Sequence, residues 1–191
     1  MKTEYEVKVS NIDYQELVEK LQQLWWTQLQ EKTLFKRVAF RHPIKEHNAY
    51  IRVRDEGTQI TCSYKEVDKT KEIDAVKEIE FVVDDFQTCV QFLQAVGLEQ
   101  KAYQETYREI RDLDGVQITF DERPGLQPFM EIEWASAEVV AQTMKALWCQ
   151  EENVIYGAVD EIYFQELWIP HHIINNMKLI TFENPPVACK E

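Results

Sequence analysis

The sequence predicts an α+β fold in which about eight antiparallel strands dominate. Several short strings alternate charged residues with apolar or aromatic ones, which is the side-chain period of a β-strand. Glycine-containing turns at Asp55-Glu56-Gly57 and Asp114-Gly115 join successive strands as hairpins. Helical spacing is confined to segments between or after the strands. The helices are therefore expected to flank a mainly antiparallel sheet.

Eight segments have the alternation and the bounding turn residues of strands. They are 3–9, 33–41, 49–54, 58–65, 73–83, 101–111, 115–121 and 128–134. The charged stretch 66–72 has no such pattern and is expected to be a loop. Eight antiparallel strands can close into a barrel that holds side chains or one small ligand.

Five helices are predicted around these strands. They run over 13–30, 85–96, 136–147, 158–167 and a short segment that Pro170 opens. Asp13 and Glu16 form the pattern of a capping box at the start of the first helix. Gly97 is placed to end the second helix. In the first helix, the pair Trp25-Trp26 is interpreted as one core and one rim residue.

The composition excludes some function classes. The chain has 191 residues, enough to bury a full core, and a net charge of −13. General binding to nucleic acid or to an anionic membrane needs a basic surface, so neither is expected. A phosphate ligand would need a local basic cluster, or would arrive with a divalent cation.

Cysteine usage and hydropathy point to the cytoplasm. The four cysteines are widely spaced, so disulfides and a zinc site are not expected and a reducing compartment fits. The N-terminus begins Met-Lys-Thr and continues with charged residues, unlike a signal peptide. No apolar run approaches the roughly 20 residues of a spanning helix.

The strand strings place like charges on one face. Arg52 and Arg54 share a face of one predicted strand, and Glu131 and Glu133 share a face of another. Such charges lie about 7 Å apart and repel each other. In an open sheet this face would meet water. In a closed barrel it would line the interior, where unpaired charges are costly unless they bind something.

Acidic and basic strands that face each other are suited to a phosphate ligand with a divalent cation. Carboxylates at alternate positions are hard oxygen ligands for Mg²⁺ or Mn²⁺. Arginine and lysine on a facing wall would bind phosphate oxygens. A single Glu-x-Glu string is most often a solvated face, but the order of the whole series is specific. The series is Glu4-x-Glu6-x-Lys8, Arg52-x-Arg54, Lys65, Glu78-x-Glu80, Arg108, Asp121 and Glu131-x-Glu133.

This series resembles the CYTH superfamily, the triphosphate tunnel metalloenzymes, over roughly residues 3–165. The hallmark Glu-x-Glu-x-Lys is similar to Glu4 to Lys8, and the paired arginines to Arg52 and Arg54. The later segment from Asp121 to Glu133 looks like the Asp-turn-Glu-x-Glu signature of the family. The resemblance implies a closed eight-stranded antiparallel β-barrel, with flanking helices, that binds a triphosphate on a basic wall and metal on an acidic wall.

The resemblance also implies residue roles. Phosphate-binding residues would be Lys8, Arg52, Arg54, Lys65 and Arg108. Metal ligands would be Glu4, Glu6, Glu80, Asp121, Glu131 and Glu133, with Mg²⁺ or Mn²⁺ as the cofactor. Catalytic residues would be Lys65, Glu4 and Glu6, with Lys65 acting on water if a crowded basic wall lowers its pKa.

The chain departs from the family pattern at several positions. Thr106 stands where many members carry a lysine, and Gln127 replaces a common glycine. The segment Leu34 to Arg37 replaces an aromatic-rich strand. Its basic residues, with Arg41, could add to a tunnel mouth, but they are interpreted as a solvated strand face. The first departure removes one phosphate-binding group, which leaves the substrate open.

Three functions are compatible with these observations. The first is a metal-dependent triphosphatase that hydrolyses inorganic triphosphate, thiamine triphosphate or a nucleotide. The second is a class IV-type adenylyl cyclase, and the third a non-catalytic polyphosphate or nucleotide binding module. Residues 1–168 would form the tunnel domain and 169–191 a helical tail. The expected partner is a small-molecule triphosphate, and a homodimer is left open.

Overall fold

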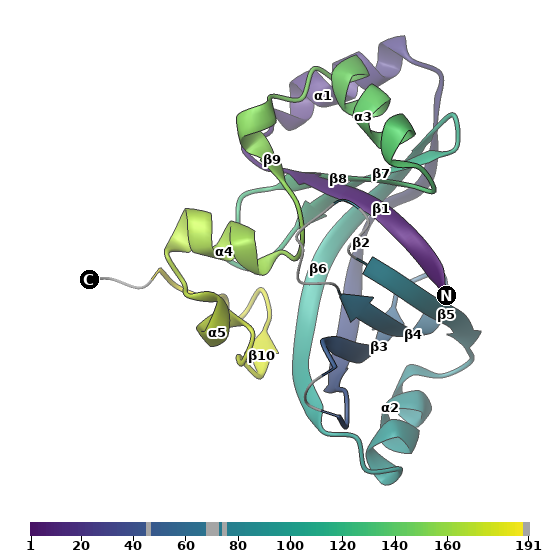
Figure 1. Ribbon diagram of the computed structural model, residues 1–191, viewed down its shortest axis with the longest axis vertical. Helices are drawn as coiled ribbons and strands as arrows, with labels where there is room; N and C mark the ends of the chain where they lie inside the picture. Colours follow the sequence, from purple (N-terminus) through teal and green to yellow (C-terminus); the bar gives the residue numbers. More distant parts are fainter. Residues whose placement is uncertain (45–46, 68–72, 74–75, 189–191) are drawn as a thin grey trace.

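The protein folds into a closed eight-stranded antiparallel β-barrel with five flanking α-helices (Figure 1). The computed structural model describes residues 1–44, 47–67, 73 and 76–188. The barrel order is β6-β2-β3-β4-β5-β1-β8-β7, and the pairing of β7 with β6 closes it. The closed barrel that the family resemblance implied is therefore confirmed.

The strands of the barrel match the predicted segments closely. They are β1 (Lys2–Val9), β2 (Trp26–Arg41), β3 (Ala49–Asp55), β4 (Ile60–Val67), β5 (Val76–Val83), β6 (Gln100–Leu113), β7 (Val116–Glu122) and β8 (Phe129–Trp134). Two short strands are added, β9 (Val154–Ile155) beside β1 and β10 (Leu179–Ile180) parallel to β6. Of the loop predicted over 66–72, residues 66 and 67 belong to β4, and 68–72 lie outside the described residues.

The first helix is much shorter than predicted. It spans Tyr14–Gln23, and β2 begins at Trp26, inside the predicted helix. Asp13 accepts a hydrogen bond from the amide of Glu16, as a helix N-cap does. Residues from Trp26 onward pair with β6 from Leu113 back to Gln100, and these long-range hydrogen bonds override the helical spacing. Trp25, in the connection, is 98% exposed.

The other helices flank the barrel and cover parts of it. They are α2 (Phe86–Ala95), α3 (Ala137–Ala146), α4 (Asp160–Leu167) and α5 (His171–Ile174), close to their predicted positions. Helices α1 and α3 lie over β1, β7 and β8, and α2 lies over β3 (Figure 1). None of the helices in the described ranges is long and apolar enough to cross a bilayer.

The apolar residues of each strand face outward, under these helices. One core cluster contains Val7, Ile118 and Ile132, all fully buried, together with Leu21 of α1. A second cluster packs Val53 and Phe40 against Val90 of α2. Because strand side chains alternate, the charged residues between these positions must point into the barrel.

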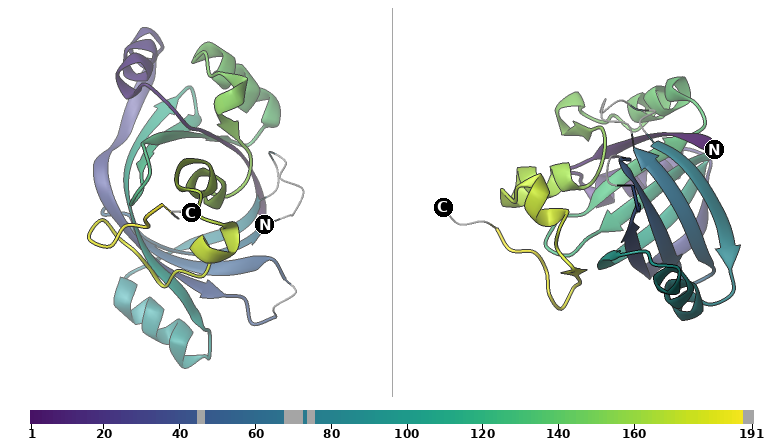
Figure 2. Two further views of the ribbon diagram at one scale, coloured as in Figure 1. Left: turned by 90° about the vertical axis from the view of Figure 1, so that its left-hand side faces the viewer. Right: turned by 60° about the horizontal axis from the view of Figure 1, so that its bottom comes forward.

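The C-terminal part of the chain lies across one end of the barrel. Viewed along the barrel in Figure 2, α4, α5 and the segment with β10 pass over the opening. The hydroxyl of Tyr163 in α4 donates a hydrogen bond to the carbonyl of Pro124, 2.9 Å away, in the turn between β7 and β8. We call residues 157–180 the C-terminal cap.

Candidate functional site

A cavity of about 810 Å³ occupies the barrel interior. This volume is in the range of small-molecule sites. Its lining contains all predicted phosphate-binding residues and most of the predicted metal ligands: Glu4, Glu6, Lys8, Arg52, Arg54, Lys65, Glu80, Arg108, Glu131 and Glu133. The closure of the barrel thus brings together charged residues from β1, β3, β4, β5, β6 and β8. Of the predicted site residues, only Asp121 does not line the cavity.

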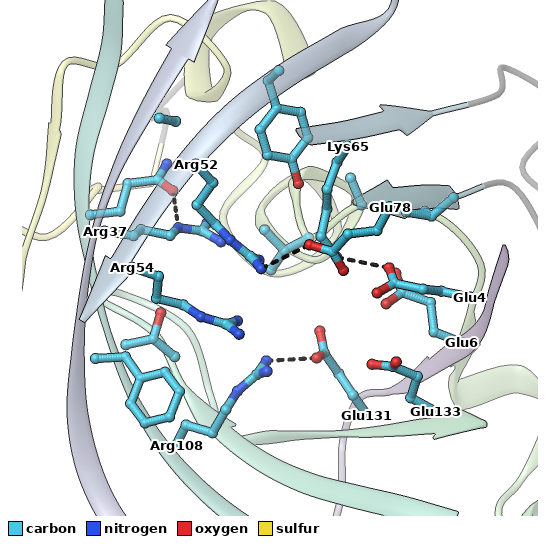
Figure 3. Close-up of a pocket in the computed structure, with 18 of the residues that line it drawn as sticks. Glu4, Glu6, Arg37, Arg52, Arg54, Lys65, Glu78, Arg108, Glu131 and Glu133 are labelled. Carbon is cyan, nitrogen blue, oxygen red and sulfur yellow. Dashed lines mark hydrogen bonds and ion pairs between the residues drawn. The ribbon is translucent and has the colours of Figure 1, made fainter. Parts of the chain in front are cut away.

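Arginines approach the cavity from one side and glutamates from the other (Figure 3). The register explains this separation. Arg52 and Arg54 lie on β3, beside β2, whereas Glu6 and Glu133 are Cα partners on β1 and β8. The predicted basic and acidic walls therefore exist as opposed surfaces of one enclosed space.

Each of the predicted cations is paired with carboxylates. Arg52 Nη2 lies 3.0 Å from Glu80 Oε2 and 3.2 Å from Glu78 Oε1. The Nε atom of Arg54 donates to Glu56 Oε1 at 2.7 Å. Lys8 Nζ lies 2.8 Å from Glu6 Oε1. These pairs neutralise buried charge inside the barrel, as buried ions require.

Lys65 bridges two carboxylates that share a proton. Its Nζ atom lies 2.8 Å from Glu4 Oε2 and 3.1 Å from Glu78 Oε2. Burial and the hydrogen bond with Glu78 raise the pKa of Glu4 to about 8. Burial alone would raise the pKa of Glu78, but the hydrogen bond from Glu4 and the charges of Lys65 and Arg52 lower it to about 2. The proton of this pair therefore resides on Glu4 at neutral pH.

The pKa of Lys65 is shifted upward, whereas the hypothesis that Lys65 acts on water required a lowered pKa. Burial, with Arg52, lowers the pKa of the Lys65 ammonium, but Tyr50, Glu6 and Glu4 outweigh these effects, and the net shift is upward. In this arrangement Lys65 carries a proton and acts as a cation.

Arg108 forms a buried ion pair with two carboxylates of the site. Its Nε and Nη2 atoms each lie 2.6 Å from an oxygen of Asp121, and Nη2 also lies 2.6 Å from Glu131 Oε2. Burial would raise the pKa of Glu131, but Arg108 and Lys8 hold it well below its ordinary value. Asp121 is fully buried. Asp121 therefore acts as an ion-pair partner that orients the guanidinium of Arg108.

The predicted metal ligands fall into two groups. Glu80, Asp121 and Glu131 are bound by arginines, whereas Glu4, Glu6 and Glu133 belong to the acidic wall. Burial and the charge of Glu6 raise the pKa of Glu133, as expected for crowded carboxylates. In the part of the chain that the structure describes, no three Asp, Glu, His or Cys side chains are close enough to hold a metal as they stand.

The chemistry of the acidic wall nevertheless fits a hard divalent cation. Glu4, Glu6 and Glu133 supply only carboxylate oxygens, which Mg²⁺ and Mn²⁺ prefer. Burial first, and then the neighbouring carboxylates, raise the pKa of Glu4 and of Glu133. A bound cation would relieve this repulsion.

Sequence reasoning missed several charged residues of the cavity. Arg37, interpreted as part of a solvated face, lines the cavity and is the Cα partner of Arg54. Arg123, interpreted only as a turn residue, also lines it and lies 3.7 Å from Asp121. Glu56 pairs with Arg54. The register of β2 against Arg52-x-Arg54 is the signal for Arg37, because Phe35, Arg37 and Ala39 share the inward face.

Thr106, where the family pattern often has a lysine, is buried and lines the cavity. Its hydroxyl donates to the carbonyl of Glu105, 2.9 Å away. The basic wall therefore lacks a cation at this position, as the sequence indicates.

Comparison with known proteins identifies the same architecture. A family model of the CYTH domain matches residues 2–162. A protein of Methanocaldococcus jannaschii named a putative adenylate cyclase is 25% identical over 165 residues, which cover 80% of this chain and 93% of that protein.

Two solved structures share the fold. One, described as a putative adenylate cyclase of Vibrio parahaemolyticus, has a TM-score of 0.72 at 14% identity and covers 84% of this chain and 97% of its own. The other, from Hippeastrum, is described as a putative adenylyl cyclase with a dominant triphosphatase activity. Its TM-score is 0.60 at 16% identity, and it covers 86% of this chain and 95% of its own.

Proposed function

This chain belongs to the CYTH family, and from that premise we propose that it is a divalent-metal-dependent enzyme that binds a triphosphate in its barrel and hydrolyses a phosphoanhydride bond. One observation carries the proposal. Five cations from four different strands, Lys8, Arg52, Arg54, Lys65 and Arg108, converge on a cavity whose opposite wall is carboxylate. No stabilising role within the fold requires that convergence, because replacing buried ion pairs by apolar residues is often neutral or stabilising.

Phosphate oxygens would take the places that carboxylates now occupy. Arg52 and Arg54 offer planar guanidinium groups for two-point contacts, and Lys8 and Lys65 offer ammonium groups. Arg108 is already oriented by Asp121. A triphosphate carries about four negative charges, which these cations can match.

The metal would be held by Glu4, Glu6 and Glu133, and the proposed ion is Mg²⁺ or Mn²⁺. When bound, such an ion neutralises charge on the phosphate chain and polarises its oxygens. The displaced carboxylate partners of the basic wall, including Glu78 and Glu80, would keep the arginines in place between turnovers.

Hydrolysis adds water across a phosphoanhydride bond. The water oxygen forms a bond to the terminal phosphorus, and the bond from that phosphorus to the bridging oxygen breaks. The leaving diphosphate group keeps the electron pair, and one proton of the water passes to a phosphate oxygen or to solvent. Because the transition state of phosphoryl transfer is loose, positioning and charge stabilisation supply most of the catalysis. Lys65, as a cation, would stabilise charge rather than take a proton from water.

A second candidate is the cyclisation of ATP, in which the ribose 3′-oxygen attacks the α-phosphorus and pyrophosphate leaves. The name of the M. jannaschii relative favours this reaction. The two reactions need the same walls and differ in where the triphosphate lies along the cavity.

One assay separates these functions. Phosphate, pyrophosphate and cyclic AMP are measured with inorganic triphosphate, thiamine triphosphate and ATP, each with Mg²⁺, Mn²⁺ or EDTA. Metal-dependent phosphate release without cyclic AMP is the expected result. Formation of cyclic AMP with an equal amount of pyrophosphate would show that the reaction is cyclisation and not hydrolysis. Tight binding without any turnover would leave a binding module.

A further inference from the structure

The capped end of the cavity carries three basic side chains that carboxylates neutralise only in part. Arg37 makes one hydrogen bond among the described residues, from Nε to Gln104 Oε1 at 2.6 Å, and no carboxylate of those residues lies within ion-pair distance. Every cation of the basic wall, by contrast, has at least one carboxylate partner. Burial and the nearby charge of Arg123 accordingly lower the pKa of Arg37 well below its ordinary value.

Two further cations lie at the same end. Arg123 is 9% exposed, and its Nε atom is buried without a hydrogen-bond partner in the described structure. Lys101 also lines the cavity, and burial and the charges of Arg41 and Arg37 lower its pKa, although the carboxylate of Asp160 acts in the opposite direction. Tyr163 of the C-terminal cap lines the same cavity, and its hydroxyl donates to the carbonyl of Pro124, the residue after Arg123, so α4 lies next to Arg123.

The space beside these cations is open to a ligand. Ala39 and Ala102 are Cα partners on β2 and β6, and both line the cavity. Their methyl groups leave room where a longer side chain would fill the barrel. The carbonyl of Gly157 accepts a hydrogen bond from Lys8 Nζ at 2.8 Å, so this end is continuous with the basic wall.

We infer that Arg37, Arg123 and Lys101 form an anion subsite at the capped end, which binds a phosphoryl group beyond the three that the basic wall holds. The preferred ligand would then be a chain of at least four phosphates. A buried, unpaired guanidinium is costly, and a phosphate oxygen is its strongest partner. The inference rests on the proposed triphosphate site and extends it by one anionic group.

Inorganic triphosphate and tetraphosphate are the probes that test this subsite. Their binding is measured by calorimetry in EDTA, so that hydrolysis consumes neither. The wild-type protein is expected to bind tetraphosphate about tenfold more tightly than triphosphate, the effect of one additional charge-assisted contact. Arg37→Gln should reduce this ratio to about one to two. Lys36→Gln should keep it, since Lys36 is exposed on the same strand and does not line the cavity.

The outcomes also separate this inference from the proposed function. If triphosphate binds and Arg37→Gln leaves the preference for tetraphosphate unchanged, the subsite is overturned but the triphosphate site is kept. Absence of binding of either anion overturns both. Folding provides a second measurement, because removing a partly buried charge without a carboxylate partner should leave the melting temperature of the ligand-free protein equal or higher. A lower melting temperature for Arg37→Gln would mean that Arg37 is already neutralised by the fold, which contradicts the inference.

Discussion

Glu6 on β1 and Glu133 on β8 are Cα partners in adjacent strands, and both line the barrel cavity. Directly opposed like charges destabilise a sheet. Burial and the charge of Glu6 raise the pKa of Glu133 as a result. The fold thus retains repulsion between these two carboxylates, and the pair lies on the wall to which we assign the metal.

Glu133→Gln tests that assignment. In EDTA the variant should melt at the same temperature as the wild type or higher, because one of two opposed carboxylates is gone. Millimolar Mg²⁺ should raise the melting temperature of the wild type, as ligand binding to the folded state does, and most of this rise should be absent in the variant. Scanning calorimetry with and without Mg²⁺ measures both effects.

Glu152→Gln is the matched control, since Glu152 is exposed and does not line the cavity. It should keep the full response to Mg²⁺. If Glu133→Gln keeps it as well, Glu133 is not a metal ligand.

Glu4→Gln should change how the stability of the metal-free protein depends on pH. The folded protein raises the pKa of Glu4 to about 8 from 4.5 in the unfolded chain. The stabilisation from its bound proton is therefore complete below pH 4.5 and is lost as the pH rises through about 8. Glutamine imitates the protonated carboxyl at every pH. The stability of the variant relative to the wild type should therefore increase as the pH rises from 5 to 8.5.

Melting temperatures of both proteins across this range, in EDTA, measure the difference. The melting temperature of Glu19→Gln, a change at an exposed position on α1, should differ from that of the wild type by the same amount at every pH. A constant difference for Glu4→Gln too would show that the proton shared with Glu78 does not exist in solution.

Arg108→Met should destabilise the fold by about 3–5 kcal/mol, because it removes the closest cation from Asp121 and from Glu131, which lie in the barrel interior. Lys32→Met is a close control. Lys32 also pairs with a β7 carboxylate, that of Glu122 at 2.6 Å, but the two side chains are 51% and 40% exposed.

In urea unfolding, Lys32→Met should lower the free energy of unfolding by at most about 1 kcal/mol. Equal losses for the two variants would refute the view that burial sets the strength of the Arg108 pair. Adding Asp121→Asn to Arg108→Met should recover part of the stability, since it removes one stranded charge.

Arg52→Ala should weaken the binding of inorganic triphosphate about 10- to 100-fold, the loss expected for a charge-assisted hydrogen bond. The side chain is buried and bonded to Glu78 and Glu80, so the truncation removes a preoriented group. Calorimetry in EDTA measures the affinity without turnover. Arg41→Ala, at the exposed end of β2, should bind normally, and unchanged affinity in Arg52→Ala would remove Arg52 from the site.

Much of this architecture could be predicted because strand patterns are local. In β1, for example, Val7 is fully buried on the outer side, and its neighbours Glu6 and Lys8 line the cavity, as alternation requires. The β3–β4 hairpin was predictable for the same reason, since Gly57 has a φ of 81° that favours glycine.

The errors arose where distant partners decide the structure. Residues 24–30 were predicted as helix, yet from Trp26 they form β2, since β6 offers them a long antiparallel ladder, interrupted by register shifts around Gln30. Arg37 has the local sequence of an exposed strand residue, and only closure of the barrel turns it inward.

The sequence alone determined that charges of both signs would alternate with apolar residues along each strand, because that pattern needs only the period of two. The tertiary structure alone decided which charges meet. Glu80 and Asp121 carry the same carboxylate as Glu6 and Glu133, but the register sets the first two against arginines and the last two against each other. Attraction and repulsion between charges depend on distance across strands, and only the closed barrel fixes those distances.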